Sequence, residues 1–135
     1  MTIDEWIPSA RASARFERIG HEFLAEFLEV ERGLRPENLD ALFELGHTYT
    51  HLGRYEDGLE VDQTLARLMP TNPTVHYNLA CSLSLLERIE EALSTMEKSV
   101  ELGLDDFDLV KDDSDLDNLR SEPRFIAIVK RLTEL

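Results

Sequence analysis

Two histidines one helical turn apart are the first residues of this chain whose types and spacing suggest chemistry. His47 and His51 occur in HTYTH, and a helix over this stretch would present both imidazoles on one face, as a divalent metal requires. Two ligands do not complete a zinc site, and the segment lacks the glutamate of the HExxH motif. Cys81 is a candidate third ligand only if it lies across a groove from them. We therefore expect ordinary groove or surface histidines, with no metal and no other cofactor.

A thiol nucleophile is a second possibility, because Cys81 is the single cysteine and His47 could act as its base. No third group that would orient the base is evident, so we expect a small buried cysteine and no enzymatic activity. A lone cysteine forms no internal disulfide, which fits a reducing cytoplasm.

The segment DSDLDNLRSEPR begins like a calcium-binding loop, with Asp113, Asp115 and Asp117 at alternate positions. Asn118 replaces the glycine of the sharp turn, and Arg124 replaces the final bidentate glutamate. We expect these acids to cap short helices and to keep the C-terminal segment solvated, rather than to hold calcium.

The formal net charge is −14, from 28 acidic and 14 basic side chains. Such a surface repels phosphate backbones and anionic lipid, so we expect no nucleic-acid partner. No window approaches the ~20 apolar residues of a spanning helix, and the N-terminus has no signal-peptide pattern, so we expect no membrane partner. Basic peptides would be attracted, although the acid also simply keeps a small protein dispersed.

An internal repeat indicates which elements position these residues, because the chain matches itself at an offset of 34 residues. In each copy, apolar residues three or four apart predict two helices, and so a helical hairpin. Gly53 suits the turn of the first hairpin, whereas Glu87 lacks the same backbone freedom in the second. The coinciding residues include Asn38 and Asn72, Leu45 and Leu79, Gly46 and Ala80, Leu52 and Leu86, Gly58 and Ala92, and Leu68 and Leu102.

Small residues recur where the two helices of each hairpin would cross: Gly46 and Gly58 in the first copy, Ala80 and Ala92 in the second. Glycine inside a helix costs up to about 1 kcal/mol relative to alanine. Its presence at both crossing points therefore predicts close helix packing.

These residues resemble the tetratricopeptide repeat, a family whose pattern has an apolar–small pair, an aromatic, further small residues and a closing proline. The resemblance covers residues 38 to 104. Asp62 occupies a place where the pattern has an aromatic residue. The matching residues are Leu45, Gly46, Tyr49, Gly58 and Pro70 in the first copy, and Leu79, Ala80, Ala92 and Met96 in the second. The other departures are Leu65, Leu83, Ser99 and Leu104.

The resemblance implies an all-α fold, a tetratricopeptide-type solenoid of helical hairpins in a single domain, with capping helices at both ends. We expect an N-terminal cap at residues 1–37, repeats at 38–71 and 72–104, and a degenerate third repeat or C-terminal cap at 105–135.

The N-terminal cap is expected to be a helix over residues 9 to 34, although a degraded repeat is an alternative. It carries a continuous apolar stripe of Phe16, Ile19, Phe23, Phe27, Val30 and Leu34. At the other end, Ser121 as N-cap and Pro123 in the first turn predict a last helix that covers the final hairpin.

In the family, the first helices of the hairpins line a concave surface that binds extended or helical peptides. Phe43 and Tyr77 would anchor apolar side chains there, unless they pack against flanking helices instead. Helical spacing assigns to this face Asp40, Phe43, His47, Thr50, His51, Thr74, Tyr77, Asn78, Cys81 and Ser84.

One family subclass clamps C-terminal carboxylates of heat-shock chaperones with lysines, an arginine and asparagines. Asn78 matches that set, but Phe43 and His47 occupy places of a lysine and an asparagine. Asp108 and Asp112 occupy two further places that require positive charge. A free carboxylate would therefore be repelled.

Three functions remain open at this point. The first is a non-enzymatic interaction module that binds a peptide or partner helix, basic or apolar, in its groove. The second is a small acidic chaperone of the secretion type, which holds partly unfolded clients. The third is a self-associating subunit whose groove is filled by the N-terminal helix of another copy.

Overall fold

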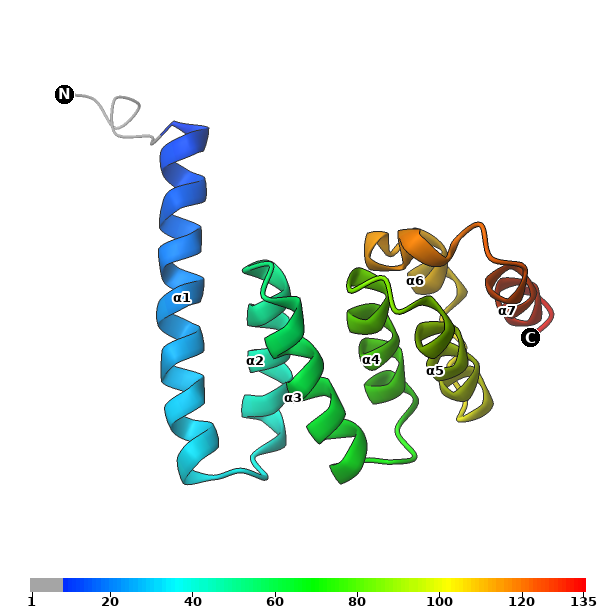
Figure 1. Cartoon of the computed structure of the whole chain (residues 1–135), viewed down its shortest axis with the longest axis horizontal. Coiled ribbons are helices and arrows are strands. Elements are labelled where there is room, and N and C mark those ends of the chain that lie inside the picture. Colours follow the sequence, from blue (N-terminus) through cyan, green and yellow to red (C-terminus); the bar gives the residue numbers. More distant parts are fainter. Residues whose placement is uncertain (1–8) are drawn as a thin grey trace.

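A computed structural model describes residues 9–135 of the chain, and within that span every regular element is helical (Figure 1). The expected all-α solenoid of helical hairpins is confirmed. The elements are α1 (Ala10–Leu34), α2 (Leu39–His51), α3 (Tyr55–Leu68), α4 (Pro73–Leu85), α5 (Ile89–Glu101), α6 (Phe107–Asp112), the 3-10 helix η2 (Ser114–Leu119) and α7 (Pro123–Thr133).

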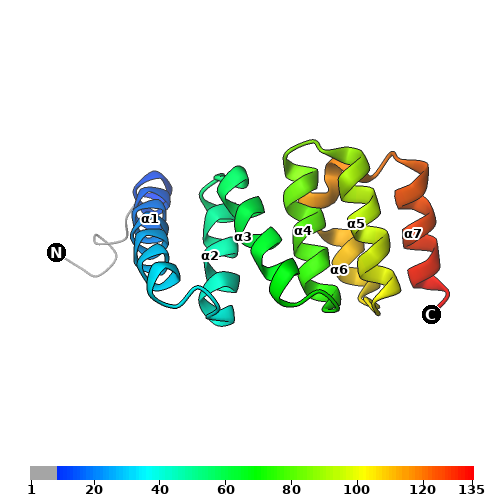
Figure 2. The same ribbon diagram turned by 60° about the horizontal axis from the view of Figure 1, so that its bottom comes forward.

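The hairpins α2–α3 and α4–α5 follow one another between α1 at one end and α7 at the other (Figure 2). Each begins with the same cap: the side chains of Asn38 and Asn72 accept hydrogen bonds from the backbone N–H groups of Ala41 and Val75. These contacts satisfy backbone donors that the first helical turn leaves unpaired. The sequence repeat is therefore also a repeat of local structure.

The turns inside the two hairpins also correspond. Gly53 has a φ of +71° and Glu87 a φ of +58°, so both lie in the left-handed region at the C-terminal end of a helix. Glycine adopts this conformation without cost, whereas glutamate is strained by its Cβ atom. The expected difference between the two turns is therefore found.

The predicted close packing occurs within the first hairpin, where α2 crosses α3. A Cβ atom added at Gly46 would lie 3.2 Å from Oδ1 of Asp62 and 3.7 Å from Cγ1 of Val61. One added at Gly58 would lie 3.6 Å from Cβ of Tyr49. In the second hairpin, Ala80 and Ala92 fill the equivalent places and are fully buried. A larger side chain at Gly46 would push the two helices apart.

The interior forms two apolar clusters rather than one. The first lies among α1, α2 and α3, and Val75 of α4 joins it. The second is larger and joins the hairpin α4–α5 to the C-terminal segment through Val110, Leu116, Phe125 and Ile128. In a solenoid each unit contacts mainly its neighbours, so stability depends on such local clusters.

The C-terminal helix α7 packs against α5 and buries Phe125, Ile128 and Leu132. It covers the last hairpin, as a terminal cap must. Pro123 lies in its first turn, as expected. The prediction of Ser121 as N-cap is wrong: Glu122 holds that position and makes no side-chain capping bond. A proline in the first turn already fixes the backbone for the helix start.

The N-terminal helix α1 extends over Ala10–Leu34, close to the expected range, and packs on α2 through Ala25 and Leu28. Its opposite face carries six large apolar side chains that are all exposed. We call these six residues the apolar stripe: Phe16, Ile19, Phe23, Phe27, Val30 and Leu34. The first eight residues of the segment expected to form the N-terminal cap lie outside the described residues.

Candidate functional site

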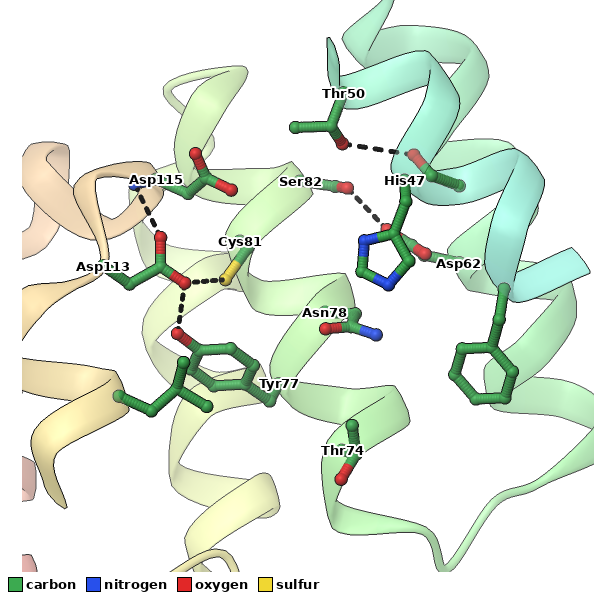
Figure 3. A pocket seen from close by; sticks show the side chains of 13 residues that line it. His47, Thr50, Asp62, Thr74, Tyr77, Asn78, Cys81, Ser82, Asp113 and Asp115 are labelled. Carbon is green, nitrogen blue, oxygen red and sulfur yellow. Dashed lines mark hydrogen bonds between the residues drawn. The ribbon is translucent and has the colours of Figure 1, made fainter. Parts of the chain in front are cut away.

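A cavity of about 410 Å³ lies where α2, α3 and α4 meet the C-terminal segment (Figure 3). Its volume falls in the range of small binding pockets, roughly 300–1,000 Å³. Helical spacing had assigned much of its wall to the concave face. The expected residues that line it are Phe43, His47, Thr50, Thr74, Tyr77, Asn78 and Cys81.

Phe43 and Tyr77 play different parts in this wall, although both were expected as anchors. Phe43 is partly buried against the first apolar cluster and still faces the cavity. Tyr77 is only 4% exposed and belongs to the second cluster. Tyr77 therefore packs against flanking elements, which was the alternative to its role as an anchor for a ligand. Phe43 keeps more surface for a ligand.

Three other expected residues do not line this cavity. Asp40 is exposed outside it, and His51 stacks on His21 of α1, with ring centroids 4.9 Å apart. The assignment of Ser84 to the open face is wrong, because Ser84 is fully buried. Nδ2 of Asn118 donates a 2.8 Å hydrogen bond to the carbonyl oxygen of Ser84, so the C-terminal segment covers this end of α4.

A carboxylate from the C-terminal segment organises one side of the cavity. Oδ2 of Asp113 accepts a hydrogen bond from the Tyr77 hydroxyl and lies 3.8 Å from Sγ of Cys81. Its other oxygen, Oδ1, accepts from the backbone N–H of Asp115 at 3.0 Å and so caps η2. Asp113 thus joins α4 to the segment that closes the cavity (Figure 3).

The surroundings of Cys81 do not activate its thiol. Burial raises the pKa of Cys81, and the negative charge of Asp113 raises it further, although a hydrogen bond with Tyr77 acts in the opposite direction. Burial raises the pKa of the Tyr77 hydroxyl as well. Because a nucleophile must be a thiolate, this site favours the inert protonated form.

The metal ligands considered from sequence are not gathered at one point. Among the described residues, the group with metal-ligand spacing is Cys81, Asp113 and Asp115, whose ligand atoms lie within 4.8 Å of one another. Asp113 already serves Tyr77 and the cap of η2. Asp113 therefore caps η2, which is the role expected for these acids, and His51 is directed to His21 instead.

A second carboxylate, Asp62 of α3, lies at the back of the cavity. Its Oδ2 accepts a 2.5 Å hydrogen bond from the Ser82 hydroxyl of α4, and the side chain is almost fully buried. Burial raises the pKa of Asp62 from 3.8 to about 6, although the Ser82 hydrogen bond lowers it in part. The sequence offered one signal of this buried carboxylate: Asp62 occupies a place where the repeat pattern has an aromatic residue.

The cavity is electronegative. Three carboxylates face it, from Asp62, Asp113 and Asp115, and within residues 9–135 no lysine or arginine lines it. Burial raises the pKa of Asp115, and the negative charges of Asp113 and Asp117 raise it further, although His51 and His47 act in the opposite direction. Sequence reasoning missed Gly46, Asp62, Ser82, Leu109, Asp113 and Asp115 as lining residues.

Comparison with known proteins agrees with this architecture. The family model of the tetratricopeptide repeat matches residues 73–103. Over 92 residues the chain is 30% identical to a protein of Arabidopsis thaliana whose name describes it as chloroplastic. That match covers 66% of this chain and 28% of the relative, so the chain spans less than a third of the relative's length.

A solved structure, the MamA RS-1 ArsTM double mutant, has a similar fold. The TM-score is 0.64 at 17% sequence identity, over 85% of this chain and 67% of that chain. Within the part of the chain that the structure describes, no helix is long and apolar enough to cross a membrane. Residues 73–103 thus match a tetratricopeptide repeat, and the solenoid of helical hairpins around them supports a place for the chain in that family.

Proposed function

We propose that the chain is a non-enzymatic interaction module, and that its cavity binds a peptide or partner helix through a lysine or arginine side chain. The observation that carries this proposal is the three carboxylates of Asp62, Asp113 and Asp115 around one cavity without a lysine or arginine among its described lining residues. A cationic side chain placed there would form charge-assisted hydrogen bonds with carboxylate oxygens.

The remaining wall supplies the other contacts that a peptide needs. Phe43 and Leu109 offer apolar surface beside the carboxylates, and Asn78 and Thr74 offer hydrogen bonds to a peptide backbone. A bound arginine or lysine would lay its aliphatic stem on the apolar residues while its head meets the acids. The same carboxylates disfavour the alternative of a chaperone that holds unfolded apolar segments in this cavity.

The net charge of −14 supports the same partner class, because a negative protein attracts cationic partners over distance. For its compartment we propose the cytoplasm, on the argument that Cys81 is a lone, buried, free cysteine. The relative that carries the word chloroplastic in its name offers a second compartment to examine.

Selection of peptides from a random display library tests the proposal, followed by titration of the best peptide. We expect selected peptides to carry a lysine or arginine next to an apolar residue. Asp115→Asn should weaken binding by roughly tenfold, the size of one charge-assisted hydrogen bond. Phe43→Ala should also weaken it. Raising the salt concentration should weaken the wild-type complex, because screening reduces the attraction between charges.

Asp108→Asn is the matched control, because Asp108 is an exposed aspartate of α6 outside the cavity. It removes the same charge without touching the site, and we expect an unchanged dissociation constant. Selected peptides without a basic residue, or equal losses in Asp108→Asn and Asp115→Asn, would contradict the proposal.

A further inference from the structure

The cavity does not explain the apolar stripe of α1. Its six side chains are between 55% and 71% exposed. They lie on the face opposite Ala25 and Leu28, which pack on α2, so the stripe points away from the rest of the molecule. They are spaced by three, four, four, three and four residues, a period close to that of a straight helix. The stripe is thus one continuous apolar ridge.

Among residues 9–135, nearly half of α1 also has no neighbouring helix to support it. At about 1.5 Å per residue, its 25 residues run roughly twice as far as the 13 residues of α2. His21 stacks on His51 at the last residue of α2, so residues 10–20 project beyond that helix (Figure 1). Isolated helices of this length are marginal in water, so this projecting segment is expected to gain from a partner.

We propose that α1 pairs with α1 of a second copy of this chain, antiparallel and face to face, about a two-fold axis at Phe23. In this register Ile19 faces Phe27 of the second copy, and Phe16 faces Val30. The projecting segment of each chain then lies on the half of the other α1 that α2 supports. Because the stripe points away from α2, the two solenoids extend to opposite sides without collision.

The charges along α1 favour a second copy of α1 as the partner of the stripe. They also favour an antiparallel orientation of the two helices. Its N-terminal half is basic and its C-terminal half is acidic, so two antiparallel copies place opposite charges together, whereas parallel copies would place like charges together. The basic residues of the first half are Arg11, Arg15 and Arg18, against Glu17. The acidic residues of the second half are Glu22, Glu26, Glu29 and Glu31, against Arg32.

The area is sufficient for a stable pair. Side chains of this size, exposed to this degree, each contribute roughly 100 Å², so the stripes of two chains would bury on the order of 1,200 Å². That value lies at the lower end of specific protein–protein interfaces. Flanking charged residues would add to it.

Sedimentation of the whole chain over a range of concentrations tests the pairing. We expect the wild type to reach twice the 15.5 kDa of one chain. Phe23→Glu should shift it to monomer, because two buried glutamates would meet at the axis. Ile126→Glu is the matched control, since Ile126 of α7 is also exposed at 57% and lies far from α1. The Ile126→Glu variant should remain a dimer.

Cysteine cross-linking tests the direction of the pair. A mixture of Phe16→Cys chains and Val30→Cys chains should form a mixed disulfide on mild oxidation, whereas Phe16→Cys alone should not cross-link to itself. Self cross-linking of Phe16→Cys would show a parallel pair and overturn the proposal.

A third variant separates this pairing from one in which α1 of another copy enters the cavity. Phe43→Ala alters the cavity and should leave the dimer intact. Loss of the dimer in Phe43→Ala, a dimer that persists in Phe23→Glu, or a wild type that stays monomeric at millimolar concentration would each overturn the proposal. A monomeric wild type would mean that the stripe binds a partner other than a second copy of the chain. None of these outcomes depends on whether the cavity binds basic peptides.

Discussion

At the scale of single residues, Asp62 shows how burial changes chemistry. An aspartate in solution is ionised at neutral pH, but this carboxyl is almost fully enclosed and its pKa rises to about 6. Ser82 supplies one hydrogen bond, which compensates only part of the lost hydration. A carboxylate at the back of the cavity is consistent with the proposed binding of a cationic side chain.

Asp62 makes the stability of the protein depend on pH in a predictable direction. Because its folded pKa of about 6 exceeds the ordinary 3.8, the folded state binds the proton more tightly than the unfolded state. The contribution of Asp62 to the stability of the fold is therefore fully present below pH 3.8 and is lost as the pH rises through about 6. A shift of this size corresponds to about 3 kcal/mol. Asp62→Asn should remove this loss of stability with rising pH. Urea unfolding between about pH 4 and pH 7 measures it.

The informative quantity is the difference in pH dependence between variants, because it isolates the part that belongs to Asp62. Asp108→Asn, at an exposed position, should retain the pH dependence of the wild type. If Asp62→Asn and the wild type lose stability in parallel as pH rises, the assigned pKa is wrong.

At the scale of elements, the two hairpin turns offer a natural comparison. They have the same geometry, with a left-handed residue after the first helix, but one uses Gly53 and the other Glu87. Corresponding hydrogen bonds close both turns, from Arg54 N–H to the Tyr49 carbonyl and from Arg88 N–H to the Leu83 carbonyl. The sequence repeat therefore fixes the turn even where it supplies a residue that fits less well.

Exchanging the residue types should reveal this strain. Gly53→Ala should lower the free energy of unfolding by roughly 1 kcal/mol, because alanine is disfavoured at positive φ and nothing within 4 Å of the added Cβ would compensate. Glu87→Gly should raise it by a few tenths of a kcal/mol, since relief of strain exceeds the extra entropy of glycine in the unfolded chain. Chemical denaturation measures both. A loss of stability in Glu87→Gly would contradict this account.

At the scale of the whole molecule, the solenoid depends on both of its ends. The C-terminal end is closed, because α7 covers α5 and completes the second apolar cluster. The N-terminal end presents the apolar stripe, which the proposed pairing of two α1 helices would close in the same way. A solenoid with one closed and one open apolar end is suited to assembly through the open one.

Substitutions at two adjacent residues of α7 measure how much the C-terminal cap contributes to the free energy of unfolding. Phe125 is 2% exposed and Ile126 is 57% exposed. Phe125→Ala should lower the free energy of unfolding by about 3–5 kcal/mol through lost burial and a cavity, whereas Ile126→Ala should change it by less than about 0.5 kcal/mol. Thermal and urea denaturation provide the comparison. Similar effects of the two substitutions would show that α7 does not close the core as described.

Several features could be predicted from sequence because they depend on neighbours along the chain. The helical spacing and the offset of 34 residues predicted the hairpins, and the small residues at Gly46 and Ala80 predicted their close crossing. The same spacing placed seven of the expected groove residues, Phe43 and Asn78 among them, on the wall of the cavity. Local rules fix such features wherever the rest of the chain lies.

Only the tertiary structure decided what covers each helical face. Spacing places Ser84 with Cys81 on one side of α4, but it does not show that the C-terminal segment folds back over Ser84. Nor does it show that Asp62 and Asp113, from distant parts of the chain, meet at one cavity. The physical reason is that helical periodicity relates residues within one helix. Which neighbour buries a face depends on packing between elements, and that packing gave the cavity its charge.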